Sequence, residues 1–268
     1  MDPVFQLWCV RRHGHRDPGG AVGQDVDPGR GAGTYRPSDL VVSKRQSPNQ
    51  AQPVVQRVRM RYSKTGRMRF GSARDFQRAL ERAVRRAAVP VAMSGGFNPH
   101  PRISYANAVP TGDSSLAEYV EIGLAVAMTP DRLAEVINDG LPDGFRIVAA
   151  IESPGGGLAD RLEASRWRIE LPGRTQASIA AAVEHMLTNA PVTVPRMTKS
   201  GTRDIAVSDN WVGFEAHDGI LLATVRTATP TVRPDDVVRA LRLGPAGLCT
   251  RESQGPLLDG AVADPFGA

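Results

Sequence analysis

The chain has 268 residues, of which 41% are hydrophobic, so it is long enough for one large or two small domains with buried cores. No apolar run approaches the roughly 18 residues of a membrane-spanning helix. The two cysteines, Cys9 and Cys249, lack the spacing of a zinc site, a disulfide framework or an iron–sulfur cluster. The net charge of +5 permits an anionic partner, and we expect two domains, no metal site and no cofactor.

Residues 1–53 are rich in Gly, Pro, Asp and Arg and show no sustained periodicity, which predicts a disordered N-terminal extension. An alternative is a start site placed too early, since a domain pattern begins only after this segment. An acidic residue precedes the short apolar patch at the N-terminus, and no small-residue cleavage site follows it. This is not the pattern of a signal peptide, so we expect a cytoplasmic protein.

Residues 54–153 alternate between strand and helix patterns. Val58, Met60 and Tyr62 alternate with three arginines, which is typical of a half-buried strand, and Ser72 opens a helix as its N-cap. The predicted elements are, in chain order, a strand at 57–62, a helix at 72–88, strand segments at 91–93 and 102–109 around a loop, a strand at 117–126, a helix at 129–141 and a strand at 145–153. The order β-α-β-β-α-β is that of the ferredoxin-like fold.

Residues 154–164 contain three consecutive glycines and are predicted to be a linker. A second, smaller α/β domain of related layout is expected at 165–254, followed by a disordered tail at 255–268. Its predicted elements are a strand from Trp167 to Leu171, a helix at 175–189, four strands between 192 and 226, and a helix at 233–243. The fold class is therefore α+β: a ferredoxin-like βαββαβ unit followed by a second α/β unit.

The positive charge is concentrated in the first domain, where residues 57–102 hold twelve basic residues against Asp75 and Glu81. In a helix over 72–88, the apolar side chains fall on one side and five arginines on the other. A face of like charges repels itself along the i, i+4 rows, and arginine suits bidentate contact with phosphate. The pattern indicates binding to RNA, against the alternative of a solvated helix face. The arginines are Arg74, Arg78, Arg82, Arg85 and Arg86.

Two connections extend this predicted surface. The strand-to-helix connection at 61–70 places Lys64, Arg67 and Arg69 around Thr65 and Gly66, without the glycine spacing of a P-loop. The loop at 93–112 holds a histidine between two prolines, which restrict the backbone and present the ring rigidly. Mixed stacking and phosphate contact suits RNA or a partner protein; the alternative is a rigid structural connection. The loop candidates are Phe97, Asn98, His100, Arg102 and Tyr105.

The stretch from "RVRMRYSKTGRMRF" through "SGGFNPHPRISYANAVPTG" to "AEYVEI" resembles the radical-SAM-linked domain of unknown function. The resemblance covers about residues 55–255, and its most specific parts are "SKTG", "SGGFNPHPR" and the later "EY". In that family the domain is fused behind a radical SAM module or occurs as a separate protein, so the resemblance implies a partner enzyme. This chain lacks the C-x-x-x-C-x-x-C motif that holds the radical SAM cluster, so it cannot perform that chemistry alone.

Three functions stay open from the sequence. The first is a non-catalytic module that presents RNA, such as tRNA or rRNA, to a separate modifying or processing enzyme. The second is a small RNA-modification enzyme in which His100 and a carboxylate, Glu118 or Glu121, transfer a proton. The third is a scaffold that binds only protein. An enzyme requires the histidine and a carboxylate to converge in a pocket, whereas a binding module requires an open basic face.

Overall fold

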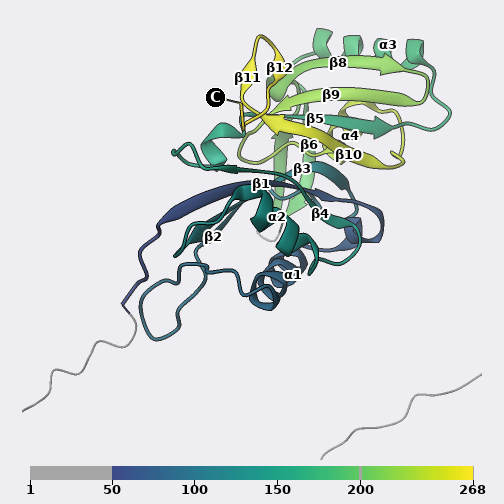
Figure 1. The fold of residues 1–268 in the computed structure, drawn as a ribbon. Coiled ribbons are helices and arrows are strands. Elements are labelled where there is room, and N and C mark those ends of the chain that lie inside the picture. Colours follow the sequence, from purple (N-terminus) through teal and green to yellow (C-terminus); the bar gives the residue numbers. More distant parts are fainter. Residues whose placement is uncertain (1–49, 199–200, 268) are drawn as a thin grey trace, which may run out of the picture. The chain divides into compact units, whose positions relative to one another are not determined.

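The computed structural model describes residues 50–198 and 201–267. These residues form four α-helices and a main sheet of eight strands, which confirms the α+β class (Figure 1). The predicted N-terminal extension lies outside the described residues except for its last four. None of the helices in the described part of the chain is both long and apolar enough to cross a membrane.

The first half of the described chain has the ferredoxin-like arrangement that the sequence predicts. Its sheet has the order β4-β1-β3-β2, and every neighbouring pair is antiparallel. The elements are β1 (Gln56–Lys64), α1 (Ala73–Arg86), β2 (Ile103–Ala106), β3 (Ser114–Leu124), α2 (Pro130–Asn138) and β4 (Phe145–Glu152). The segment at 91–93 contributes only isolated bridges, from Val91 to Leu124 and from Met93 to Pro101.

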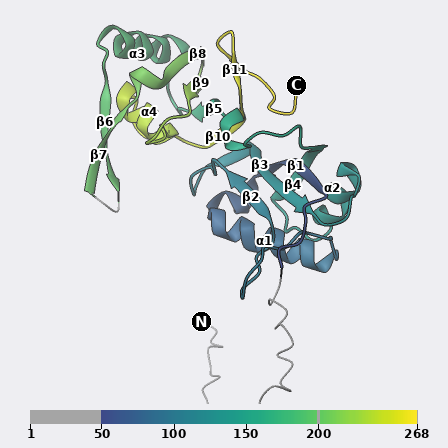
Figure 2. The same ribbon diagram turned by 90° about the vertical axis from the view of Figure 1, so that its left-hand side faces the viewer.

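The second half repeats this topology. Its strands have the order β10-β5-β9-β8, again all antiparallel, so they match β4-β1-β3-β2 position by position. The elements are β5 (Ala164–Glu170), α3 (Gln176–Thr188), β8 (Trp211–His217), β9 (Ile220–Arg226), α4 (Pro234–Leu241) and β10 (Cys249–Gly255). Between α3 and β8, β6 (Thr193–Thr198) and β7 (Gly201–Ala206) form a separate hairpin (Figure 2).

The two halves share one sheet, because β10 pairs with β3 in parallel through Thr250 with Ser114 and Arg251 with Ser115. Each half nevertheless has its own apolar core. In the first, α1 and α2 cover one face of the sheet, and in the second α3, α4 and the β6–β7 hairpin do so. The junction between the halves therefore lies where β3 meets β10.

Packing explains why α1 forms where it does. Its N-terminus is closed by a capping box, in which the Ser72 side chain accepts a hydrogen bond from the Asp75 backbone and the Asp75 carboxylate accepts one from the Ser72 backbone. Its apolar side rests on β1, with the Phe76 ring stacked on Tyr62 at 3.7 Å between centroids and edge-on to Phe145 at 5.1 Å. This packing directs the opposite, basic side of the helix to solvent.

The connection between the halves is folded against the open face of the first sheet. Leu158 and Leu162 are buried against Ala117 and Tyr119 of β3, and the carbonyl oxygens of Gly155 and Gly156 accept hydrogen bonds from Arg59. The predicted position of the domain boundary stays a prediction.

The prediction of a disordered tail from Gly255 is wrong for residues 255–267. Leu257–Leu258 and Ala261–Val262 form a short hairpin, β11 and β12. Phe266 then packs edge-on to Tyr119 at 5.6 Å between ring centroids, and Asp264 forms an ion pair with Arg61. The tail has few apolar residues and no periodic pattern of them. It is ordered because Phe266 packs against Tyr119 of β3 rather than against the tail itself.

Candidate functional site

The basic side of α1 is an open surface. Arg74, Arg78, Arg82, Arg85 and Arg86 are all exposed, and we call them the arginine face. None of them forms an ion pair with another described residue, although ion pairs are present elsewhere in the fold. Of the two acids on the helix, Asp75 is held in the capping box and Glu81 is half-buried. The positive charge of this face is therefore not neutralised within the described chain.

The strand-to-helix connection adds one aromatic side chain to this surface. The short 3-10 helix Gly66–Phe70 carries Arg67, which is exposed, and Arg69, whose guanidinium lies 4.4 Å from the centre of the Phe70 ring. That ring is 62% exposed. Proteins that bind single-stranded nucleic acids combine exposed aromatic side chains, on which bases stack, with basic side chains that contact the backbone.

Lys64 does not belong to this surface, contrary to the sequence-based interpretation. It is buried at the end of β1, where its ammonium donates a hydrogen bond to the Pro110 carbonyl oxygen at 3.3 Å. Burial lowers the pKa of Lys64, against the opposing effect of nearby Glu118. Lys64 therefore belongs to the interior near the junction.

The loop that carries the histidine is closed on itself. The Ser94 backbone N–H donates to the His100 carbonyl oxygen at 2.8 Å, and the His100 backbone N–H donates to the Ser94 hydroxyl at 2.9 Å. These bonds explain how the loop holds the histidine: they fix its backbone and leave the residue exposed, together with Asn98 and Arg102. Phe97, at 89% exposed, stands at the tip.

Tyr105 differs from the other loop candidates. Its ring lies edge-on to Phe76 in the first core, at 6.2 Å between centroids, and burial raises its pKa. Its hydroxyl has no hydrogen-bond partner among the described residues. Tyr105 is therefore a core residue rather than part of the open surface.

The two candidate carboxylates form buried ion pairs on opposite faces of β3. Glu118 accepts hydrogen bonds from Arg251 Nη2 at 2.6 Å and from the Val109 backbone at 3.0 Å. Glu121 accepts from Arg59 Nε at 2.7 Å and from the Ser153 hydroxyl at 2.8 Å. No hydrogen bond or ion pair joins His100 to either carboxylate within the described ranges. The structure does not bring the predicted acid–base set together.

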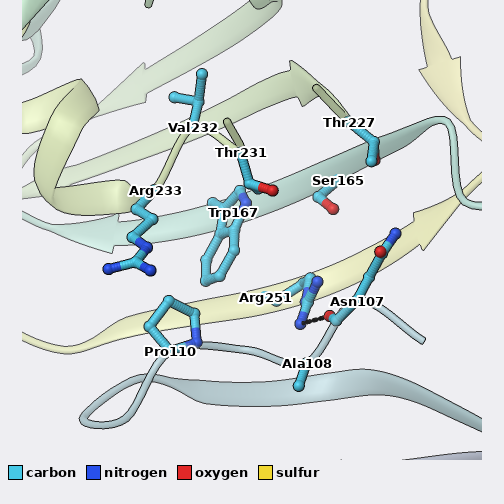
Figure 3. Close-up of a pocket in the computed structure, with 10 residues that line it drawn as sticks. All are labelled: Asn107, Ala108, Pro110, Ser165, Trp167, Thr227, Thr231, Val232, Arg233 and Arg251. Carbon is cyan, nitrogen blue, oxygen red and sulfur yellow. Dashed lines mark hydrogen bonds between the residues drawn. The ribbon is translucent and has the colours of Figure 1, made fainter. Parts of the chain in front are cut away.

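A cavity that the sequence did not predict opens at the junction of the two halves (Figure 3). Its volume is about 140 Å³, and we call it the junction cavity. Residues from both halves line it: Asn107, Ala108, Pro110, Ser165, Trp167, Thr227, Thr231, Val232, Arg233 and Arg251.

Arg251 is the central side chain of this cavity and is only 4% exposed. Besides its ion pair with Glu118, Nη2 donates to the Asn107 carbonyl oxygen at 2.8 Å and Nη1 to Gln254 Oε1 at 3.2 Å. The guanidinium also lies 5.2 Å from the Trp167 ring centre. Its Nε has no hydrogen-bond partner among the described residues.

A second pocket adjoins the junction cavity and extends toward the start of α1; together we call them the cleft. The second pocket shares three residues with the junction cavity. It is lined by Ala73, Ala108, Val109, Pro110, Thr111, Asp113, Arg233 and Asp235. Burial, and secondarily Asp235, raise the pKa of Asp113 to about 6. This half of the cleft therefore carries acids, whereas the junction cavity has none in its wall.

The comparison with protein families shows to which family this chain belongs. A family model described as an uncharacterized protein conserved in bacteria (DUF2344) matches residues 57–234, and the chain belongs to this family. No curated protein matches the chain. The matched region begins in β1 and ends at the first residue of α4, so it includes the arginine face and the histidine loop but not Arg251.

Proposed function

We propose that this member of the family is a non-catalytic RNA-binding module, with tRNA or rRNA as the ligand, and that it serves a separate modifying or processing enzyme. The observation that carries the proposal is the arginine face, whose five exposed arginines have no ion pair with any described residue. A solvated surface helix normally mixes charges of both signs, because like charges three or four residues apart destabilise it.

The chemistry of this surface matches an RNA backbone. Arginine binds phosphate in a bidentate manner, and each phosphate contact releases condensed counterions. The exposed rings of Phe70 and Phe97 supply faces on which unpaired bases can stack, and His100 is held on the same loop as Phe97.

The accessory role has separate support. Both carboxylates that could assist His100 are held in buried ion pairs, which favours binding over proton transfer. The likeness to the radical-SAM-linked domain supports a radical SAM enzyme as the partner, since this chain has two cysteines and not the three of the cluster motif.

Salt-dependent RNA binding tests the proposal. Replacing Arg78 and Arg82 together with alanine should weaken binding to all RNA sequences. It should also lower the slope of log affinity against log salt by about 0.7–0.9 for each phosphate that the variant no longer binds. Both side chains are exposed, so folding should not change. The matched control is the pair Arg203→Ala and Arg226→Ala in the second half, which also removes two exposed arginines.

Unchanged affinity and slope in the α1 variant would refute RNA binding by this face. Binding of an acidic protein by the parent, abolished in the same variant, would instead favour the scaffold hypothesis. An equal weakening in both variants would show a general charge effect rather than a site.

A further inference from the structure

We propose that the junction cavity binds a terminal phosphate group, that is, a phosphomonoester. This site is distinct from the arginine face and does not require it.

The wall of the cavity is rich in hydrogen-bond donors and free of acids. Two of its ten residues are arginines, and none is Asp or Glu. Three hydroxyl side chains and one side-chain amide add neutral polar groups: Ser165, Thr227, Thr231 and Asn107. The Thr231 hydroxyl already donates to the Ala228 carbonyl oxygen at 3.2 Å. Such donors are the groups that bind an oxyanion, although the Glu118 carboxylate behind the wall already pairs with Nη2 of Arg251 at 2.6 Å.

Arg251 supplies a donor that the protein itself does not satisfy. The side chain lies in the cavity wall, and its Nε–H is buried below the accessible surface of that wall and has no partner among the described residues. A buried donor without a hydrogen bond is destabilising, and native proteins satisfy the great majority of such groups. Its two other nitrogens are held by Glu118, Asn107 and Gln254, so the guanidinium is already oriented before any ligand arrives.

Arg233 supplies the second charge. It is exposed at the N-cap of α4, and its guanidinium forms no ion pair within the described residues. Figure 3 shows its side chain beside Trp167 and Pro110 at the cavity. Asp113 and Asp235 line the adjoining part of the cleft, which Arg233 also lines, and the charges of Arg233 and Arg251 act on the Asp113 carboxyl.

The cavity has room for a phosphate group, since its volume is about 140 Å³. A terminal phosphate presents three free oxygens to the donors of the wall and an internal phosphodiester only two, so this wall favours a phosphate that ends a chain.

Two sources could supply such a group: the end of an RNA or a free phosphorylated molecule. The cleft reaches Ala73 in the first turn of α1, so an RNA on the arginine face would have a route to the cavity. The assignment to an RNA end rests on the proposed function, whereas the phosphate site itself does not.

The first experiment uses inorganic phosphate and AMP as probes with the full chain. Phosphate should shift the indole N–H signal of Trp167 in a saturable manner, with sodium chloride at matched ionic strength as the reference. The signals of the three tryptophans can be assigned with Trp8→Phe and Trp211→Phe. AMP should bind and adenosine should not.

Two variants of exposed wall residues test the geometry. Arg233→Ala removes the charge and Thr231→Leu fills the cavity, and each should weaken AMP binding about tenfold or more. Arg203→Ala, on the β6–β7 hairpin, is the matched control and should bind as the parent does. Absence of a saturable shift, or equal weakening in Arg233→Ala and Arg203→Ala, would overturn the proposal.

The second experiment compares RNA oligonucleotides that carry a terminal phosphate, at the 5′ or the 3′ end, with the same RNA ending in hydroxyls. About tenfold tighter binding of one phosphorylated form, abolished in Arg233→Ala, would assign the site to an RNA end. If AMP binds but the end group has no effect on RNA affinity, the site takes a free phosphorylated molecule. If AMP binds and RNA does not, the proposed function fails while the phosphate site stands.

Discussion

The two halves of the molecule share a topology and differ in the charge of their first helix. α1 carries five arginines and packs through Phe76, Leu80 and neighbouring apolar residues. α3 occupies the corresponding position in the second half and packs through Ile179, Val183 and Met186, but it contains no arginine or lysine. The fold constrains only the buried side of each helix, so the exposed side is free to diverge. The difference supports the proposal that the first half carries the binding surface. The junction is where the two halves contact each other.

The largest expected effect tests that dependence. Arg251→Met removes the cationic partner of Glu118, which is 1% exposed, and leaves a buried carboxylate without its ion pair. Such a change typically costs about 3–5 kcal/mol in the free energy of unfolding. Urea unfolding of the full chain measures it. Because Arg251 comes from the second half and Glu118 from the first, a change near zero would mean that this ion pair between the halves contributes nothing to stability.

Two controls sharpen this result. Adding Glu118→Gln to Arg251→Met removes the unpaired charge and should recover part of the stability. Arg132→Ala breaks an ion pair whose side chains are 60% and 63% exposed, and it should change stability by less than about 1 kcal/mol.

The next largest effect concerns the histidine loop, which belongs to the first half. If the His100 ring stacks on a base, His100→Ala should weaken RNA binding by about 1–3 kcal/mol. The salt dependence should be unchanged, because stacking of a ring on a base releases no counterion. The melting temperature should also be unchanged, since the residue is exposed and the Ser94 bonds use its backbone. Parental affinity in this variant would exclude the ring from the RNA interface.

A smaller effect is expected at the N-caps of α1 and α3, where we compare the loss of unfolding free energy when each cap is replaced. Ser72 takes part in a two-way capping box, whereas Thr175 only accepts a hydrogen bond from the Ser178 backbone. Replacement of an N-cap by alanine costs about 0.5–2 kcal/mol. We expect Ser72→Ala near the upper end of this range and Thr175→Ala near the lower end, by chemical denaturation. The Ser72 hydroxyl also donates to the Asp75 carboxylate at 2.7 Å, and the reverse order would show that this second bond of the hydroxyl adds no stability.

The last comparison is a pH dependence with opposite signs at two carboxyl groups. Burial raises the pKa of Asp113 to about 6, so the folded state holds a proton that the unfolded state loses near pH 4. Stability should therefore fall as pH rises from about 4 to 6, and Asp113→Asn should flatten this decline. Hydrogen bonds from Ser72 lower the pKa of Asp75, so its contribution is present above its unfolded pKa and is lost in more acidic solution. A decline between pH 4 and 6 that persists in Asp113→Asn would contradict the assignment.

Much of the first half was predictable, because short sequence patterns mark where its strands and helices begin. Alternating residues mark β1, and the capping box at Ser72 marks the start of α1. The second half was predicted as a related α/β unit, but nothing local separates the β6–β7 hairpin from the main sheet. The pairing of β3 with β10 depends on side chains far apart in the sequence, which periodicity cannot reveal.

The part of the candidate site on α1 was predictable, because helix periodicity determines which residues lie on the exposed side of the helix, as for the arginine face. The interpretation of Lys64 was wrong for a reason that the sequence contains: it continues the alternation of Val58, Met60 and Tyr62, which all face the core. Glu118 shares the face of Val120 and Ile122 in the same way. The junction cavity had no such signal, since its Arg251 meets Asn107 across 144 positions of the chain.

The ion pair between Glu118 and Arg251 spans 133 residues, and this separation has a consequence for biosynthesis. A ribosome releases the whole ferredoxin-like first half well before β10 is made. During that interval Glu118 lacks its cation, and the nascent chain can present the arginine face but not a complete junction cavity. We therefore expect the arginine face to form while the chain is still being translated, and the junction cavity to form only after residue 251 has left the ribosome.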